Sequence, residues 1–360
     1  MRLGVKLRQS LPVLFTWPSV AQSLGLGGAG FAGVSDTPLG VKVTLHLRPP
    51  ASASIIAAAH ERIAAAYGAA RVRVQADPLA SDVVWLFFDY ALALSGVLYP
   101  WDDAPTHPPL DPLRPLPLGI DDSGDAVVIE PLGQGVLLGG IPGSGKSNAI
   151  RVLLAGLSQS RDVALWGIDP KQAELVLWRS RFSRLVLGHD EVQTTALLED
   201  LLAIIHRRAL YLATTGGASL LPGARFPAIV LVVDEWAEVG ATGSTKDRQR
   251  IDGLLRRVVS LGRAVGITAV LATQRPTSDT IDVTTRSLLA HRFALRVGDR
   301  YQAAATLGVG SYDPSQLIGA SPGRALWSDG GPARAVQVFR VPDEMVPSIV
   351  ASSWTPSSQE

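Results

Sequence analysis

Short apolar segments alternate with longer amphipathic segments over the last two thirds of the chain. The short segments are continuous apolar runs, which predict buried strands. They are residues 135–138, 163–168, 184–187, 229–233, 268–272, 293–297, 325–327 and 335–339. The long segments repeat apolar residues with a helical period. They predict helices at 146–157, 191–213, 248–264 and 301–307. Strands separated by helices predict an α/β domain whose mostly parallel sheet is covered on both faces.

The first third of the chain has a different pattern, which predicts a small α+β domain at residues 41–99. Residues 41–47 and 71–75 alternate and residues 83–88 form a continuous apolar run, so all three predict strands. The alanine-rich stretch 51–67 predicts a helix between them.

The remaining segments are expected to connect or flank these two domains. Residues 1–40 have no clear period and are expected to form an N-terminal arm. Residues 100–117 contain seven prolines, which predicts a semi-rigid linker. The main domain is then expected at 118–345, followed by a C-terminal tail at 346–360.

Composition excludes several classes of protein. The chain has 360 residues, of which 47% are hydrophobic and 18% charged, and this excludes global disorder. The absence of cysteine excludes a disulfide framework, a thiolate zinc site and a cysteine nucleophile. The net charge is only +1, but residues 246–300 carry 11 basic against 5 acidic side chains. The apolar stretch 83–101 contains Asp89, which favours a buried strand over a membrane span. We therefore expect a cytoplasmic protein with no transmembrane segment of its own.

One glycine-rich segment carries a specific phosphate-binding signal. Residues 140–147 read GIPGSGKS and match G-x-x-x-x-G-K-[ST] between an expected strand and an expected helix. The glycines let successive N–H groups turn around phosphates, and the helix N-terminus adds positive charge. The expected nucleotide-binding residues are Gly140, Ile141, Pro142, Gly143, Ser144, Gly145, Lys146, Ser147 and Asn148. Lys146 is expected to reach the β- and γ-phosphates, and the Ser147 hydroxyl to ligate Mg²⁺. The predicted cofactors are therefore ATP and Mg²⁺.

Two adjacent acids follow the apolar run at 229–233. Asp234 can orient Mg²⁺ through water, so Ser147 and Asp234 are the expected metal residues. Glu235 is the expected general base for an attacking water. Two acids after a strand also fit a solvated turn, but the phosphate-binding segment favours the catalytic interpretation.

Two further polar segments end expected strands. Thr273 and Gln274 lie in LATQRP, where either side chain can meet the γ-phosphate or the lytic water. Ile168-Asp169-Pro170-Lys171 ends another strand, and its simplest interpretation is a capped turn. The carboxyl ends of parallel strands meet at one edge of a sheet, so these segments are expected to converge on the ligand.

The order GIPGSGKS, IDPK, VVDE and LATQRP resembles the motor domain of the FtsK/SpoIIIE family of double-stranded DNA translocases. The similarity covers about residues 118–341 and continues through RSLLAHRFALRVGDRYQAAATL at 286–307. It implies a RecA-like P-loop NTPase core that assembles as a homo-hexameric ring around duplex DNA. The small domain resembles, more loosely, the ring-forming domain that precedes the motor in this family. Arginine-rich and lysine-poor usage is similar to that of actinobacterial plasmid-transfer translocases.

The resemblance also implies an arginine finger that acts on the neighbouring subunit. The family's arginine starts the strand after LATQRP, which here is Arg292, with Arg296 and Arg263 as alternatives. The expected catalytic residues are therefore Lys146, Glu235, Gln274 and Arg292.

The loop GATGSTKDRQR at 240–250 is the expected DNA contact. Its basic side chains, Lys246, Arg248 and Arg250, suit phosphate contacts that ignore sequence, although a solvated helix start has the same composition.

The leading functional hypothesis is an ATP-driven duplex DNA translocase in plasmid or mobile-element transfer or in chromosome segregation. One alternative is a ring ATPase that drives protein secretion, and another is a regulator that binds ATP and DNA without moving. Recruitment to a membrane would need an anchoring partner.

Overall fold

A computed structural model describes residues 13, 16–37, 40–77, 79–90, 115–130, 132–160, 162–220, 222–223, 225–239, 241–277, 280, 283–308, 310 and 312–352. Internal contacts divide the chain into two units. The first comprises Met1–Val97 with Ile120–Asp125, and the second comprises Leu98–Gly119 with Ala126–Glu360.

The first unit is built on a four-stranded antiparallel sheet in the order β1-β2-β4-β3. Its elements are β1 (Ala29–Thr37), β2 (Gly40–Leu47), α2 (Ala53–Ala58), α3 (His60–Tyr67), β3 (Arg71–Ala76) and β4 (Val83–Asp89). Alternate residues of the strands, such as Leu45 and Leu86, pack with Ile56 and Ile63 of the helices. The expected helix at 51–67 is therefore two helices, which meet at Ala59.

The expectation of an arm at 1–40 is wrong for residues 16–37. Residues 16–23 are helical, and β1 pairs with β2 along its length. Trp17 is fully buried and its indole N–H donates to Ala29 O at 2.8 Å. The strand was not predicted because AGFAGVSDT lacks the large alternating side chains that mark a half-buried strand.

Asp89 ends β4 fully buried, where two arginines neutralise its charge. Arg71 and Arg73 each donate to its carboxylate at 2.9 Å. The strand interpretation of residues 83–88 is thus confirmed, while residues 91–101 lie outside the described part. None of the described helices is long and apolar enough to cross a membrane.

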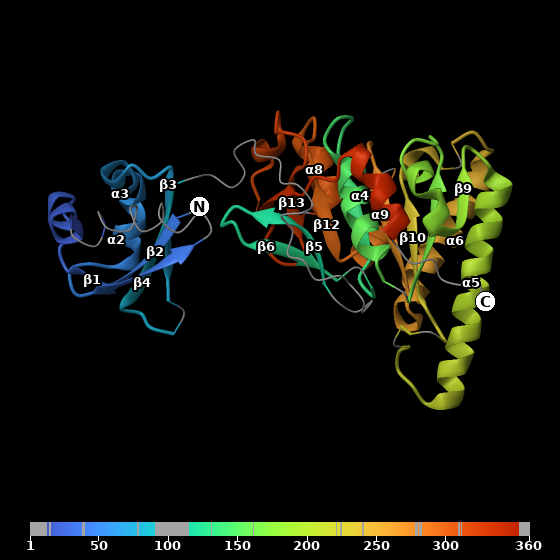
Figure 1. Cartoon of the computed structure of the whole chain (residues 1–360), viewed down its shortest axis with the longest axis horizontal. Helices are drawn as coiled ribbons and strands as arrows, with labels where there is room; N and C mark the ends of the chain where they lie inside the picture. Colours follow the sequence, from blue (N-terminus) through green and yellow to red (C-terminus); the bar gives the residue numbers. More distant parts are fainter. Residues whose placement is uncertain are drawn as a thin grey trace. The chain divides into compact units, whose positions relative to one another are not determined.

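The second unit contains a ten-stranded sheet, apart from the last two residues of β5, in the order β6-β5-β14-β13-β12-β7-β11-β10-β8-β9 (Figure 1). Its strands are β5 (Leu116–Asp121), β6 (Ala126–Ile129), β7 (Val136–Gly139), β8 (Val163–Asp169), β9 (Phe182–Leu187), β10 (Ala228–Val233), β11 (Ile267–Thr273), β12 (His291–Ala294), β13 (Arg324–Ser328) and β14 (Arg334–Val338). The six strands from β12 to β9 are parallel, whereas β13 and β14 form an antiparallel hairpin. The predicted α/β class is confirmed.

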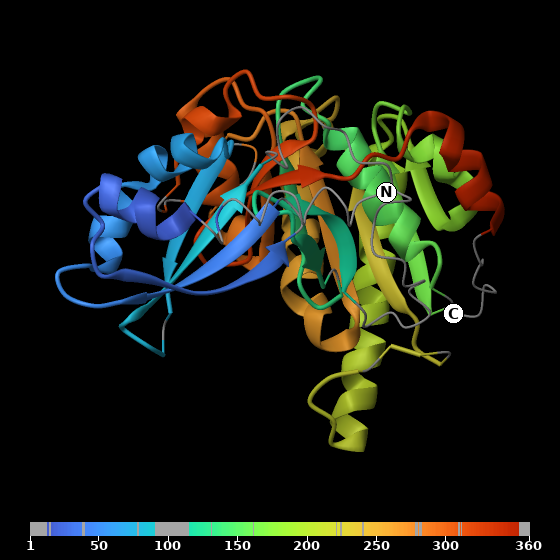
Figure 2. The same cartoon turned by 60° about the vertical axis from the view of Figure 1, so that its left-hand side comes forward.

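Helices cover both faces of this sheet. They are α4 (Lys146–Leu157), α5 (Glu191–Thr215), α6 (Thr245–Gly262), α7 (Val283–Leu288), α8 (Arg300–Leu307) and α9 (Val346–Ser352). Short 3-10 helices are η2 (Leu175–Arg181), η3 (Trp236–Glu238), η4 (Arg263–Val265), η5 (Pro314–Leu317) and η6 (Asp343–Met345). Every residue of β10 and β11 is buried, as expected for strands covered on both faces. The last part of α5 runs past the ends of the strands in both views (Figure 1 and Figure 2).

The expected edges of the main domain also need correction. Leu116 and Pro117 belong to strand β5 rather than to a linker, and residues 100–114 lie outside the described part. Residues 346–352 form helix α9, which packs on α4 and η2, so the expected tail at 346–360 is wrong in its first half. Val346 is buried by this contact. Residues 353–360 lie outside the described part.

Candidate functional site

The phosphate-binding segment at residues 140–147, called the P-loop from here on, joins the end of β7 to the start of α4. Gly143 and Gly145 have φ angles of 71° and 94°, in the left-handed region that glycine adopts at no steric cost. A Cβ at Gly145 would lie 2.4 Å from the nitrogen of Gly323, so no larger residue fits without movement. The first N–H groups of α4 have no intrahelical acceptor and point out of a positive helix end. The loop is therefore shaped to receive an anion.

Contacts from two other segments hold the loop in place. The Ile141 N–H donates to Arg296 O at 3.0 Å, and an Arg296 Nη2 group donates to Pro142 O at 3.2 Å. The Gly323 N–H donates to Ser144 O at 2.8 Å. The buried Ser144 hydroxyl has no hydrogen-bond partner among the described residues. A buried donor of this kind suits a phosphate oxygen.

Asn148 was expected to bind nucleotide, but both polar atoms of its side-chain amide already form hydrogen bonds within the chain. Its Nδ2 donates to Phe339 O at 2.6 Å, and Val341 N–H donates to its Oδ1 at 2.9 Å. Both partners lie beyond β14, so Asn148 attaches the end of that strand to α4. These contacts argue for a structural role.

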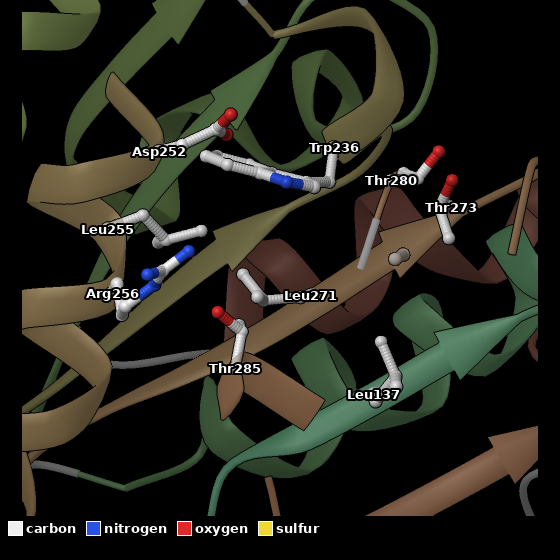
Figure 3. A pocket seen from close by; sticks show the side chains of 10 residues that line it. Leu137, Trp236, Asp252, Leu255, Arg256, Leu271, Thr273, Thr280 and Thr285 are labelled. Carbon is white, nitrogen blue, oxygen red and sulfur yellow. The ribbon is translucent and has the colours of Figure 1, made fainter. Parts of the chain in front are cut away.

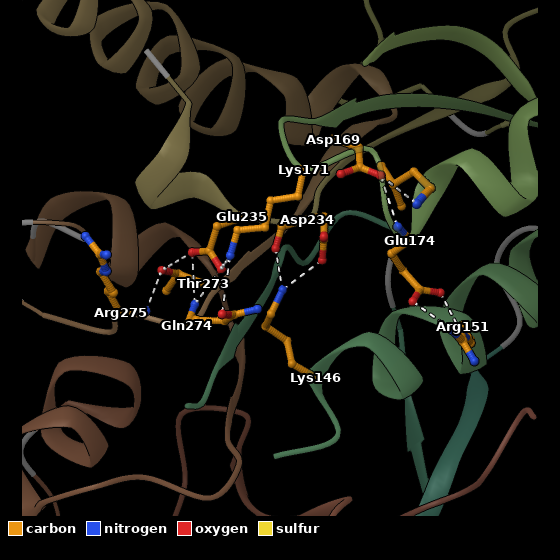
Figure 4. Close-up of polar contacts among 11 residues, drawn as sticks. Lys146, Arg151, Asp169, Lys171, Glu174, Asp234, Glu235, Thr273, Gln274 and Arg275 are labelled. Atoms are coloured by element: carbon orange, nitrogen blue, oxygen red, sulfur yellow. Dashed lines mark hydrogen bonds and ion pairs between the residues drawn. The ribbon is translucent and has the colours of Figure 1, made fainter. Parts of the chain in front are cut away.

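Asp234 is paired with the lysine of the P-loop. Its Oδ1 accepts from Lys146 Nζ at 2.7 Å, and its main-chain oxygen accepts from the same ammonium at 2.5 Å (Figure 4). Both side chains are at most 5% exposed. The structure therefore joins the P-loop to the strand-end acid, 88 residues apart in sequence.

Glu235 is buried and held by the neighbouring strand. Because Val233 pairs with Leu271, Glu235 lies beside Thr273 at the end of β11. The Thr273 hydroxyl donates to Glu235 Oε1 at 2.8 Å, and the Gln274 N–H donates to Oε1 and Oε2 at 2.9 and 3.0 Å. These donors fix the carboxylate at the carboxyl edge of the sheet. The Thr273 hydroxyl thus supports the carboxylate of the expected base, a contact that residue type alone did not predict.

The IDPK segment forms a tight turn after β8. Asp169 Oδ2 accepts from the N–H groups of Glu174 and Leu175 at 3.1 and 3.0 Å. Burial raises the pKa of Glu174, while its ion pair with Arg151 of α4, at 2.5 Å, acts in the opposite direction. Lys171 projects from this turn toward the catalytic edge (Figure 4). The expected convergence of the four motifs is confirmed at this edge of the sheet.

Comparison with known proteins supports the family resemblance that the four motifs indicate. No family model matches the chain. Protein Tra of Streptomyces lividans is 29% identical over 310 residues, covering 81% of this chain and 48% of that protein. DNA translocase FtsK of Lactiplantibacillus plantarum is 31% identical over 211 residues, covering 52% of this chain and 26% of the relative. A sporulation regulatory protein of Streptomyces azureus is 34% identical over 223 residues, covering 58% of this chain and 71% of that protein.

The chain belongs to the FtsK/SpoIIIE family. It spans about half, or less, of the length of the first two relatives. Among solved structures, the pCW3 conjugation coupling protein TcpA has the same fold, with a TM-score of 0.62 and 18% identity. That match covers 92% of this chain and 97% of the solved chain, and so includes residues of both units.

The structure separates the three arginines considered for an FtsK/SpoIIIE-type finger. Arg296 contacts its own P-loop at Pro142 O, whereas Arg263 is exposed in η4, just before the amino end of β11. Arg292 lies at the start of β12, and its Nη1 donates to Leu307 O at 2.9 Å. Burial, followed by the neighbouring charge of Arg286, lowers the pKa of Arg292.

The expected DNA contacts of this FtsK/SpoIIIE chain lie at the start of α6. Lys246, Arg248 and Arg250 are exposed there, and residue 240 lies outside the described part. Arg250 donates to the carboxylate of Glu199 on α5 at 2.6 Å. Ser244 caps the helix by accepting from the Asp247 N–H. The three basic side chains therefore differ, because Arg250 has an acidic partner within the chain.

Proposed function

We propose that this chain is the ATP-hydrolysing motor of a double-stranded DNA translocase. The observation that carries the proposal is the pair of buried acids that end β10. Asp234 joins the P-loop lysine, and Glu235 is fixed by Thr273 and the main chain of Gln274. A P-loop alone supports nucleotide binding, but a fixed carboxylate beside it supports hydrolysis.

The residues present fit ATP and Mg²⁺. The orphaned Ser144 hydroxyl and the glycine positions that a Cβ would obstruct suit phosphates, as does the positive end of α4. Ser147 and Asp234 would hold Mg²⁺, which supplies charge neutralisation at the phosphates when bound. No group of three His, Cys, Asp or Glu side chains that could hold a metal ion occurs among the described residues. Lys146 would exchange Asp234 for phosphate, and Glu235 would accept the proton of the attacking water.

We further propose a homo-hexameric ring around duplex DNA, with Arg292 as the finger that reaches the neighbour. Arg296 lies against its own P-loop, so Arg292, at the other end of β12, is better placed to act on another subunit. The names Tra and conjugation coupling protein favour DNA transfer between cells, although relatives named FtsK keep chromosome segregation open. Recruitment to a membrane would require an anchoring partner.

The decisive experiment compares ATP hydrolysis with and without duplex DNA, and then measures displacement of a triplex-forming strand. Translocation predicts both DNA-stimulated hydrolysis and strand displacement. Stimulation by a protein substrate, with none by DNA, would favour a secretion ATPase. Binding of ATP and DNA without displacement would favour a regulator that does not move.

A further inference from the structure

Lys171 makes contacts that neither the IDPK turn nor the proposed hydrolysis explains. Its Nζ lies 3.4 Å from Glu235 Oε2 and 3.3 Å from Gln274 Oε1 (Figure 4). Its side chain is 36% exposed, while that of Glu235 is 2% exposed. The ammonium therefore bridges the expected base and the expected water-orienting residue from the open side of the site.

This position conflicts with the chemistry of the base. A water that Glu235 activates and Gln274 orients must lie within hydrogen-bond reach of both side chains. Lys171 Nζ lies within hydrogen-bond reach of both the Glu235 and the Gln274 side chains. The other donors to Glu235, from Thr273 and the Gln274 main chain, approach from β11. The ammonium and an attacking water thus compete for the remaining side of the carboxylate.

We propose that Lys171 is a positioning residue that blocks Glu235 until DNA is bound. The inference rests on the proposed function, because it assigns the regulation of that same site. In the blocked state, Lys171 occupies the water position between Glu235 and Gln274. In the active state, Glu235 and Lys171 separate and water takes the place of the ammonium.

The Lys171 side of the contact is rigidly mounted. The turn that carries it is closed by Asp169, and Gln172 has a φ of 54°, a strained value for a residue other than glycine. Glu174 of the same turn is paired with Arg151 on α4. Lys171 therefore moves with the P-loop helix.

The segment that carries Glu235 continues along the chain to the expected DNA contact. Glu235 is followed by η3 and then by the start of α6 at Thr245, so that Lys246 lies eleven residues after Glu235. A cavity of about 110 Å³ lies between η3, α6 and β11, lined by Trp236, Leu255 and Thr273 among others (Figure 3). Because Thr273 and the Gln274 N–H hold the Glu235 carboxylate on β11, phosphates that contact Lys246 would move η3, β11 and the carboxylate together, away from the turn that carries Lys171.

The test measures ATP hydrolysis of the full chain with and without duplex DNA. Lys171→Met should raise the rate without DNA about fivefold, the size expected for loss of one half-exposed ion pair. The DNA-stimulated rate should change less, so the stimulation ratio falls. Lys171→Arg keeps the charge and should keep the low basal rate. Lys42→Met, in the first unit, is the matched control and should leave both rates unchanged.

A loss of folding or of a merely structural contact lowers both rates and cannot raise the basal rate. A basal rate that is unchanged or lower in both Lys171→Met and Lys171→Gln, with melting temperatures like that of the wild type, would overturn the inference. The basal measurement uses no DNA, so it decides the role of Lys171 separately from the proposed translocation. A wild type that hydrolyses ATP without any DNA stimulation would instead count against the proposed function.

Discussion

At the scale of single residues, two neighbours in sequence have different partners. Asp234 faces the P-loop lysine, whereas Glu235 faces strand β11, because successive residues leave a strand end in different directions. From the sequence alone, Asp234 was predicted to orient Mg²⁺ and Glu235 to act as the general base. The sequence did not reveal Thr273 as the donor to Glu235, because that contact depends on the register of β10 against β11.

The first prediction separates nucleotide binding from hydrolysis. Glu235→Gln should bind ATP normally and hydrolyse it about 10²- to 10⁴-fold more slowly, because only the base is lost. Lys146→Ala should fail to bind ATP. Binding of a fluorescent ATP analogue and release of phosphate measure the two steps. Wild-type turnover by Glu235→Gln would show that another group takes the proton.

The second prediction concerns the finger. Arg292→Ala should bind ATP but lose DNA-stimulated hydrolysis by about 10³-fold, the lower end of the effect of known fingers. Arg286→Ala is the control, since Arg286 also donates to the end of α8, at Ala305 O, and should keep most turnover. Mixing Arg292→Ala with Lys146→Ala should restore some hydrolysis, because an intact P-loop can then face an intact arginine. Normal turnover by Arg292→Ala alone would eliminate it as the finger.

At the scale of elements, the pattern of apolar residues predicted the central strands and helix α4 well. It predicted the elements at the two ends of the chain poorly. Helix α4 has the predicted bounds, and strands β7 to β11 differ from theirs by at most two residues. Every residue of β7, β10 and β11 is buried, which is why their apolar runs were clear in the sequence. Strand β1 and helix α9 were not predicted. Both are short or glycine-containing segments that are stabilised by contacts outside the element itself: β1 pairs with the neighbouring strand β2, and α9 packs on α4 and η2. The side-chain contacts of Asn148 were not predicted because their partners lie about 190 residues away in sequence.

The third prediction tests the revised role of Asn148. Asn148→Ala removes an acceptor and a donor from two main-chain groups, which should cost about 1–3 kcal/mol and lower the melting temperature by several degrees. Affinity for ATP should stay within about threefold of the wild type. Ser147→Ala is the contrasting variant, with normal melting and loss of Mg²⁺-dependent turnover. A loss of ATP binding at an unchanged melting temperature would restore Asn148 to the nucleotide site.

At the scale of the whole molecule, charge is local rather than global. The net charge of +1 provides no general attraction for DNA, so the proposed DNA binding must depend on specific basic segments. At the start of α6, Lys246 and Arg248 are exposed, while Arg250 is committed to Glu199. The sequence identified the three basic residues but not this difference, because Glu199 lies on another helix.

The fourth prediction follows from that difference. Replacing Lys246 and Arg248 together by alanine should weaken binding about equally on unrelated duplexes. It should also reduce the slope of log affinity against log salt by about 1.8, at roughly 0.9 for each phosphate contact. Adding Arg250→Ala should change the slope less than either of the others, because a phosphate must first displace Glu199. An unchanged slope, measured by fluorescence anisotropy over a salt series, would place the DNA surface elsewhere.

The position of β7 within the sheet has a consequence for amide hydrogen exchange. Parallel partners, β11 and β12, flank this strand on both sides, and Val136, Leu137 and Leu138 are fully buried. Amides in such a place exchange only when the domain opens as a whole, whereas turns and helix ends exchange through local opening. The P-loop is thus attached at one end to a strand whose amides are expected to exchange slowly. Deuterium uptake should therefore rise within a few residues, from the protected strand to the loop that follows it.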